Sequence, residues 1–174
     1  MSRGIVKTLA VIAILVSTGW GAVAEAACQK TYPLFFIERS KNRNRVHYDA
    51  CLTERNELSE SGPVIAYWVL ENGQRGELNI IERKYAYGVS SSAKTGKESA
   101  WFTLAALKNR KVSIRKIGGA YKAIMAVRGQ EVILDRVFIA SRERRLRQPK
   151  VLYVDLFGHA VKGNAPVKER IVPR

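Results

Sequence analysis

Ser91 and Lys94 stand in an S-x-x-K pattern, and Lys94-Thr95-Gly96 reads K-T-G. Penicillin-recognising enzymes use both motifs for acyl transfer, with the serine opening a helix and K-T-G on a distant strand. One lysine cannot serve both positions. The segment 88–97 also approaches a phosphate-binding loop, but its glycines are too far apart and Glu98 stands where a Ser or Thr is required. Neither pattern therefore predicts catalysis.

The chain has two histidines, His47 and His159. Together with Asp49 and Asp155 they could supply metal ligands, but the sequence has no HExxH motif and no tight histidine cluster. It also lacks the G-x-S-x-G turn of a serine hydrolase. We therefore predict no catalytic residue, no metal site and no cofactor.

Basic residues are the strongest candidates for binding. Two groups lie at turns, around Lys41 and around Lys108. The densest group is predicted to bind an anion and consists of Arg142, Arg144, Arg145, Arg147 and Lys150. Arginine binds phosphate and carboxylate through two parallel hydrogen bonds. No aromatic residues are interleaved with this group, so it does not predict a stacking platform for nucleic acid.

Aromatic residues suggest a second kind of site. Tyr67, Trp68 and Tyr87 lie around a strongly apolar segment and could line a cavity for one small ligand, as in small β-barrels. The alternative is that they simply fill the core.

The elements that must position these residues are mostly strands. Residues 45–52 alternate, with Val46, Tyr48, Ala50 and Leu52 on one face, as in a half-buried strand. Residues 64–70 are continuously apolar, which predicts a strand near the middle of the fold, buried on both faces.

Residues 77–86 form the best helix candidate. Leu78, Ile81 and Tyr85 recur at helical spacing and predict one apolar stripe facing the core. With about eight strands separated by short turns, the chain is expected to be mainly β. We predict an antiparallel meander that forms a barrel or a sandwich.

Short motifs spread along the chain resemble an uncharacterised family, domain of unknown function 4833. The matching motifs are Phe36-Ile37-Glu38-Arg39-Ser40, Asn42, Asn44, Val46, Tyr48, Pro63-Val64, Tyr67-Trp68, Glu82-Arg83 and Ala86-Tyr87-Gly88. The resemblance extends from about Tyr32 to Ile171 and implies no activity, cofactor or catalytic residue. It does single out a motif site made of Arg39, Ser40, Asn42, Asn44, Glu82 and Arg83.

The first 26 residues predict a secretory signal peptide. A basic start at Arg3 and Lys7 precedes an apolar stretch and an Ala24-Glu25-Ala26 cleavage site. The apolar stretch is shorter than the roughly 20 residues of a transmembrane helix. Glu25 occupies the aliphatic position of a lipobox before Cys28, which disfavours a lipid anchor. The mature chain, residues 27–174, is then expected to be a single β-rich domain in the periplasm or outside the cell.

The net charge indicates what kind of partner this domain attracts, and the cysteines indicate a disulfide. Removal of Arg3, Lys7 and Glu25 leaves 28 basic and 14 acidic residues, a net charge of +14. Such a charge attracts anions. Cys28 and Cys51 are the two cysteines and are predicted to form a disulfide in an oxidising compartment.

These observations favour an exported, non-enzymatic β-domain that binds an anionic envelope component or a small ligand. Anionic lipid, lipopolysaccharide or another polyanion is the expected partner, and nucleic acid is not expected as a physiological one. Two alternatives stay open: an envelope hydrolase with an unfamiliar site, and a structural or interaction module that uses a sheet edge.

Overall fold

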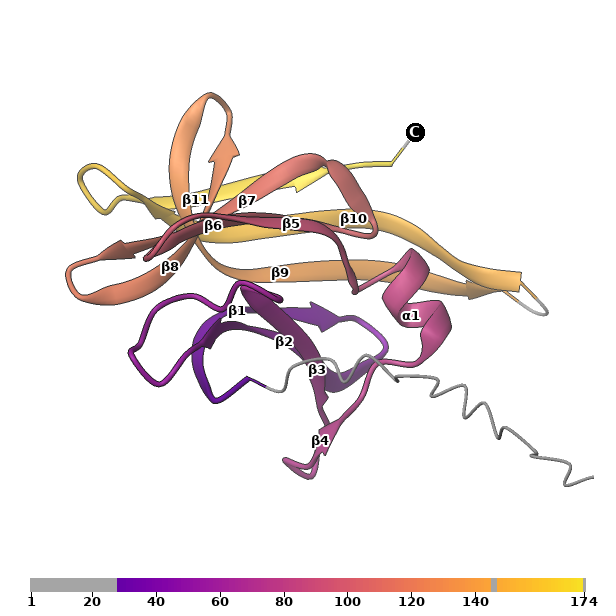
Figure 1. The fold of residues 1–174 in the computed structure, drawn as a ribbon. Coiled ribbons are helices and arrows are strands. Elements are labelled where there is room, and N and C mark those ends of the chain that lie inside the picture. Colours follow the sequence, from indigo (N-terminus) through magenta and orange to yellow (C-terminus); the bar gives the residue numbers. More distant parts are fainter. Residues whose placement is uncertain (1–27, 145–146, 174) are drawn as a thin grey trace, which may run out of the picture.

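A computed structural model describes residues 28–144 and 147–173 and shows a mainly β protein (Figure 1). The described residues form eleven strands and one short helix, more strands than the sequence predicted. The strands are β1 (Lys30–Arg39), β2 (Asn42–Leu52), β3 (Val64–Val69), β4 (Arg75–Gly76), β5 (Val89–Gly96), β6 (Ser99–Leu104), β7 (Leu107–Ile117), β8 (Ala120–Val127), β9 (Gln130–Arg144), β10 (Arg147–Ala160) and β11 (Pro166–Ile171). The signal peptide predicted for residues 1–26 lies outside the described residues.

The strands form one sheet that curls into a half-barrel (Figure 1). Its order is β4-β3-β2-β1-β9-β8-β7-β6-β5, with β10 on the other edge of β9 and β11 beyond it. Neighbouring strands are antiparallel, as predicted, except for β1 and β9. These two run parallel where Phe36–Arg39 lie beside Arg136–Ile139. One edge of β9 therefore pairs first with β8 and then with β1, which a simple meander does not do.

The core lies on the inner face of the curled sheet. The predicted alternation in β2 is confirmed, since Val46, Tyr48, Ala50 and Leu52 are all buried. The Tyr48 ring stacks on Phe35 with a centroid distance of 4.6 Å. Its hydroxyl donates a hydrogen bond of 2.6 Å to the Tyr87 carbonyl oxygen. Burial raises the pKa of Tyr48 well above its usual value, so this donor stays protonated.

β3 corrects the prediction of a central strand buried on both faces. It lies next to the last strand of the sheet path, and only Val64 and Trp68 are buried. Its one long partner is β2, because β4 pairs only with Trp68 and Val69. The remaining side chains of β3 are half-buried.

Helix α1 (Ile80–Tyr85) falls inside the predicted range but is only six residues long. Asn79 caps it: its side chain accepts from the Glu82 backbone N–H, and the Glu82 carboxylate accepts from the Asn79 N–H. The predicted core-facing stripe is wrong. Leu78 precedes the cap and is buried, whereas Ile81 and Tyr85 are 65% and 59% exposed. Because the helix begins after Leu78, this residue is not part of the helical repeat. Ile81 and Tyr85 therefore need not face the same side as Leu78.

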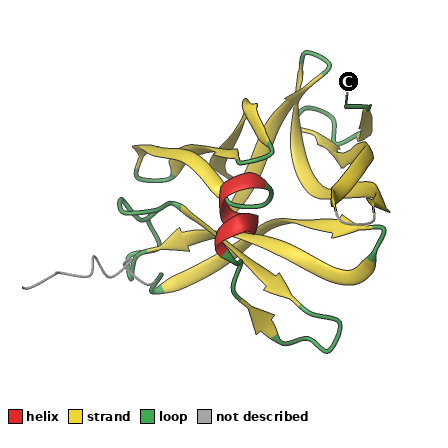
Figure 2. Ribbon diagram, turned by 90° about the vertical axis from the view of Figure 1, so that its right-hand side faces the viewer, coloured by secondary structure: helices red, strands yellow, loops and turns green. Residues whose placement is uncertain are grey.

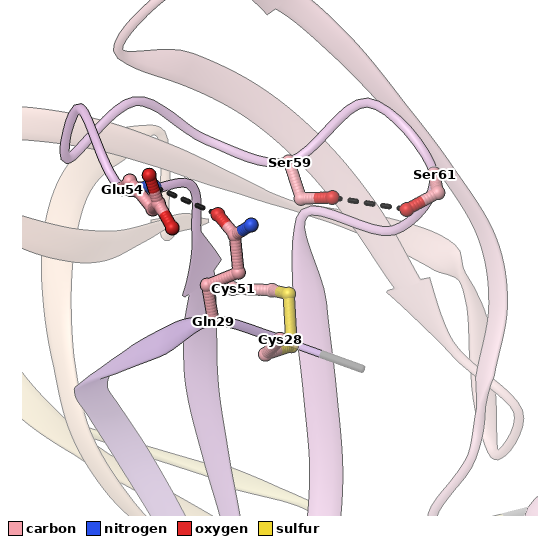
Figure 3. Close-up of a disulfide and its surroundings, with 6 residues drawn as sticks. All are labelled: Cys28, Gln29, Cys51, Glu54, Ser59 and Ser61. Carbon is pink, nitrogen blue, oxygen red and sulfur yellow. Dashed lines mark hydrogen bonds between the residues drawn. A yellow bond between two sulfur atoms is a disulfide. The ribbon is translucent and has the colours of Figure 1, made fainter. Parts of the chain in front are cut away.

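The structure contains the disulfide predicted between Cys28 and Cys51 (Figure 3). It joins the segment before β1 to the end of β2. Next to it, the Gln29 side chain accepts a hydrogen bond of 2.8 Å from the Glu54 backbone N–H. Both contacts fix the first described residues to the β1–β2 pair. Within the described part of the chain, no helix has the length and hydropathy to cross a bilayer.

β11 is an edge strand that an ion-pair network holds to β10. Asp155 on β10 is buried and accepts two hydrogen bonds of 2.7 Å from the Arg170 guanidinium. Lys168 lies 3.2 Å from the same carboxylate. The hydrogen bonds from Arg170, with those from Lys168, lower the pKa of Asp155 from 3.8 to about 2.

Because this pKa is lower in the folded protein, Asp155 contributes stability that is complete above pH 3.8 and is lost as the pH falls through about 2. We expect Asp155→Asn to lower the free energy of unfolding by about 2 kcal/mol at neutral pH. The difference in stability between the variant and the wild type should shrink as the pH falls from 3.8 to about 2. Thermal melts over this pH range measure the difference. A difference that does not change with pH would contradict the stabilising role of ionised Asp155.

Candidate functional site

β1, β3 and α1 meet at one cluster of side chains. The Arg39 guanidinium lies over the Trp68 ring, with its Cζ 4.3 Å from the ring centroid. The indole Nε1–H of Trp68 donates to the Glu82 carboxylate at 3.0 Å. Tyr87 meets the Trp68 ring edge-on at 5.3 Å. Trp68 thus holds a cation on one side and an anion at its polar end.

Arg39 is held mainly by aromatic rings. Its Nη2 donates to the Asn42 side chain at 3.3 Å. Its Nε is buried and has no hydrogen-bond partner. Among the described residues no carboxylate lies within ion-pair distance of Arg39. Its positive charge is therefore not neutralised by a direct ion pair.

The rest of the motif site is partly dispersed. Asn42 and Glu82 join Arg39 at the cluster, and the Ser40 hydroxyl bonds the Ser141 backbone N–H on β9 at 3.1 Å. Asn44 instead accepts from the Glu71 N–H in the loop after β3. Arg83 turns to the other side of α1, where its Nη2 donates to Glu77 and its Nε to the Leu78 carbonyl oxygen.

Several of the motif residues hold α1 in place. The Glu82 carbonyl oxygen accepts the backbone N–H groups of Ala86, Tyr87 and Gly88. A Cβ at Gly88 would lie 1.9 Å from the Arg83 carbonyl oxygen, so only glycine fits there. The two motifs Glu82-Arg83 and Ala86-Tyr87-Gly88 are thus spaced so that the backbone of the first can contact the backbone of the second at the end of the helix.

The three aromatic residues predicted to line a cavity do not all lie on one face of the sheet. Trp68 and Tyr87 are in contact, and Trp68 is buried with the Arg39 guanidinium over its ring. Tyr67 lies on the opposite face of β3, where its hydroxyl donates to Asp49 at 2.7 Å. This bond and burial raise the pKa of Tyr67 to about 12. A separate cleft of about 440 Å³ lies between the edge of β3 and the start of β5.

Large apolar side chains are exposed at the end of the molecule that carries α1. Ile80 is 83% exposed, beside the exposed Ile81 and Tyr85. Val151 and Leu152, near the start of β10, are each 37% exposed. Figures 1 and 2 both place α1 and the hairpin formed by β9 and β10 at this end. A run of contacts also links them, from Glu82 through Trp68, Arg39 and Ser40 to Ser141, which pairs with Val151.

Exposed cations lie on the same elements and in the turn between β1 and β2. Lys41 lies in the β1–β2 turn, Lys84 on α1, and Arg142 and Lys150 face each other on β9 and β10. We call this region the basic–apolar end; it comprises Lys41, Ile80, Ile81, Lys84, Tyr85, Arg142, Lys150, Val151 and Leu152.

The predicted anion-binding group belongs to this end in part. Arg142 and Lys150 are exposed, and β9 and β10 pair through the backbones of Arg144 and Arg147. Arg145 and the side chains of Arg144 and Arg147 lie outside the described residues. The sequence missed the contribution of α1, although two adjacent isoleucines directly after a capping asparagine were its visible signal.

The residues considered for chemistry do not form a site in the described part of the chain. Ser91 and Lys94 lie on β5, and Lys94 pairs with Glu60 at 3.4 Å. His159 on β10 lies 2.6 Å from Asp135, and His47 is on β2, three strands away in the sheet. No group of three His, Cys, Asp or Glu side chains that could hold a metal occurs among the described residues.

Comparison with known proteins gives one match. The family model described as Domain of unknown function (DUF4833) matches residues 35–170. No curated protein and no solved structure matches the chain.

Proposed function

Since this chain belongs to the DUF4833 family, whose description assigns no activity, we propose from its geometry that it is an exported, non-enzymatic domain that docks on an anionic lipid surface. The docking surface is the basic–apolar end. The observation that carries the proposal is the exposure of Ile80, Ile81 and Tyr85 on a helix whose apolar stripe the sequence had placed in the core.

The apolar part of this surface suits the boundary between headgroups and acyl chains. A short helix that presents two isoleucines to water gains free energy when they enter an apolar phase, about 0.8 kcal/mol for each buried CH₂ group. Tyr85 has an apolar ring and a polar hydroxyl, the combination found at membrane interfaces. The capping box and the Trp68–Glu82 bond hold this helix against the sheet, so the side chains are presented without prior unfolding.

The cations supply the preference for an anionic surface. Lys41, Lys84, Arg142 and Lys150 are exposed at the same end of the molecule and would meet lipid phosphate groups there. Each basic residue near an anionic bilayer contributes about 1 kcal/mol, screened by salt. The net charge of the mature chain, residues 27–174, with 28 basic and 14 acidic residues (+14), adds a long-range attraction.

Export is part of the proposal. It is supported by the signal-peptide pattern of residues 1–26 and by the Cys28–Cys51 disulfide, a bond that persists in oxidising compartments. The lipid surface would then be a membrane that faces the periplasm or the outside of the cell.

The decisive variant is Ile80→Gln with Ile81→Gln, which keeps the helix length and removes the apolar contact. We expect its affinity for vesicles of phosphatidylcholine and phosphatidylglycerol to fall at least tenfold, since less apolar area enters the interface. Its thermal midpoint should not fall, because both side chains are exposed in the free protein. Co-sedimentation with vesicles and thermal melts measure the two quantities.

Val172→Gln is the matched control, because Val172 is 65% exposed and lies beyond β11 rather than on α1. A second arm replaces Arg142, Arg144, Arg145 and Arg147 by Gln, which should weaken binding and flatten its dependence on salt. The proposal would be contradicted if the wild-type protein did not bind anionic vesicles at low salt, or if it bound vesicles of pure phosphatidylcholine equally well.

A further inference from the structure

The outer face of the sheet, opposite the core, carries a row of side chains that belongs neither to the buried core nor to the basic–apolar end. Successive strands place one residue each at matching register on β3, β2, β1, β9, β10 and β11. The row consists of Tyr67, His47, Phe36, Arg136, Phe157 and Lys168. With strands about 4.8 Å apart, six positions span about 24 Å. The first five side chains are half-buried and Lys168 is exposed.

The rings in this row stand on edge. Phe36 and His47 stack with centroids 5.6 Å apart, and His47 and Tyr67 stack at 5.9 Å. Rings that stack across a sheet cover one another's faces and turn their edges to solvent. The edge of an aromatic ring carries the positive part of its quadrupole. The outward surface of this part of the row therefore favours negative groups.

Cations lie against the same rings. The Arg75 guanidinium lies 3.6 Å from the Tyr67 centroid, and that of Arg136 lies 3.9 Å from the Phe157 centroid. Lys168 approaches Phe157 from the next strand, at 5.0 Å. These contacts restrict the side chains before any ligand arrives, which lowers the entropy lost on binding.

The ion pairs on this face leave an excess of positive charge. Glu38 is shared by Arg45 and Arg136, each at 3.0 Å. Asp155 is likewise shared by Lys168 and Arg170. Each carboxylate thus neutralises one of two cations. Arg75 adds a further cation that, among the described residues, has no carboxylate within ion-pair distance. Asp49, which accepts from the Tyr67 hydroxyl, adds a third carboxylate, so this face holds five cations and three carboxylates.

We propose that this row binds an extended acidic polysaccharide, whose carboxylate, sulfate or phosphate groups pair with Arg75, Arg136 and Lys168. A linear chain matches a linear row that includes Arg136 and Lys168 and has Arg75 against its first ring. Sugar hydroxyl and C–H groups suit the alternating polar and apolar side chains. The stacked ring faces are already covered, which disfavours single-stranded nucleic acid because that ligand needs free faces for its bases. The proposal does not depend on lipid docking, which uses a different part of the molecule.

The test compares two variants that each remove two exposed positive charges. Arg75→Gln with Lys168→Gln removes cations that lie against the Tyr67 and Phe157 rings. Lys108→Gln with Lys162→Gln removes cations at the start of β7 and in the turn between β10 and β11, neither of which belongs to the row. The probe is an alginate oligosaccharide, with neutral dextran and a single-stranded oligodeoxynucleotide as comparison ligands, measured by titration calorimetry at low ionic strength. We expect at least a tenfold loss of alginate affinity for the row variant and less than a twofold loss for the control.

Equal losses in both variants would show that only net charge matters and would overturn the proposal. Absence of alginate binding by the wild type, equal binding of dextran, or tighter binding of the oligodeoxynucleotide would also overturn it. Circular dichroism of both variants establishes that each is folded before affinities are compared.

Discussion

Replacement of Trp68 by alanine is expected to lower the free energy of unfolding by about 4 kcal/mol. Trp68 is only 6% exposed, and its removal leaves a cavity where β3 and α1 meet. It also deprives Glu82 of a donor and Arg39 of the ring beneath its guanidinium. Urea unfolding, followed by far-ultraviolet circular dichroism because the variant loses a fluorophore, measures the change.

Trp68→Phe is the matched control. It retains a ring for Arg39 and Tyr87 but cannot donate to the Glu82 carboxylate. Its loss should be smaller than that of the alanine variant, about 2 kcal/mol from the missing hydrogen bond and the smaller ring. An alanine variant as stable as the wild type would show that Trp68 is exposed in solution.

Removal of the disulfide by Cys28→Ser with Cys51→Ala is expected to destabilise the protein by about 3 kcal/mol. The bond joins residues separated by 23 positions, and its loss frees the corresponding loop in the unfolded chain. Alanine is chosen at Cys51 because that side chain is buried and a hydroxyl there would lack a partner. Urea unfolding of oxidised protein and of the variant gives the difference.

The wild type treated with a reductant serves as the control and should approach the variant in stability. Thiol titration of denatured, unreduced wild type should detect no free thiol. Two titratable thiols, or a variant that unfolds at the same urea concentration as the oxidised wild type, would contradict this prediction.

Local patterns in the sequence predicted the elements that depend on neighbouring residues. The alternation of β2 and the approximate place of α1 follow from side-chain periodicity, and the disulfide follows from there being two cysteines. Which strands lie beside β3 cannot be predicted from side-chain periodicity. Its apolar run predicted burial on both faces, but burial depends on which strands and layers cover it, and β4 covers only its end. Sheet order is a long-range property that periodicity does not encode.

The candidate sites show the same division. The basic residues near the β9–β10 turn are visible as a cluster in the sequence, because they are close along the chain. The row from Tyr67 to Lys168 draws one residue from each of six strands, so only the pairing register reveals it. The exposure of Ile80 and Ile81 depends on a cap one residue before the helix, which shifts the start of the helical period past Leu78.

The parallel pairing of β1 with β9 constrains the order in which this chain can fold. Phe36 pairs with Arg136, one hundred positions later in the sequence. During synthesis, β1, β2 and β3 appear first but lack the strand that completes their edge. Their apolar inner face stays open until β9 arrives, and closing so long a loop slows folding. The chain therefore depends on remaining unaggregated through most of its synthesis, and its strongly basic composition favours this by keeping partly folded copies apart.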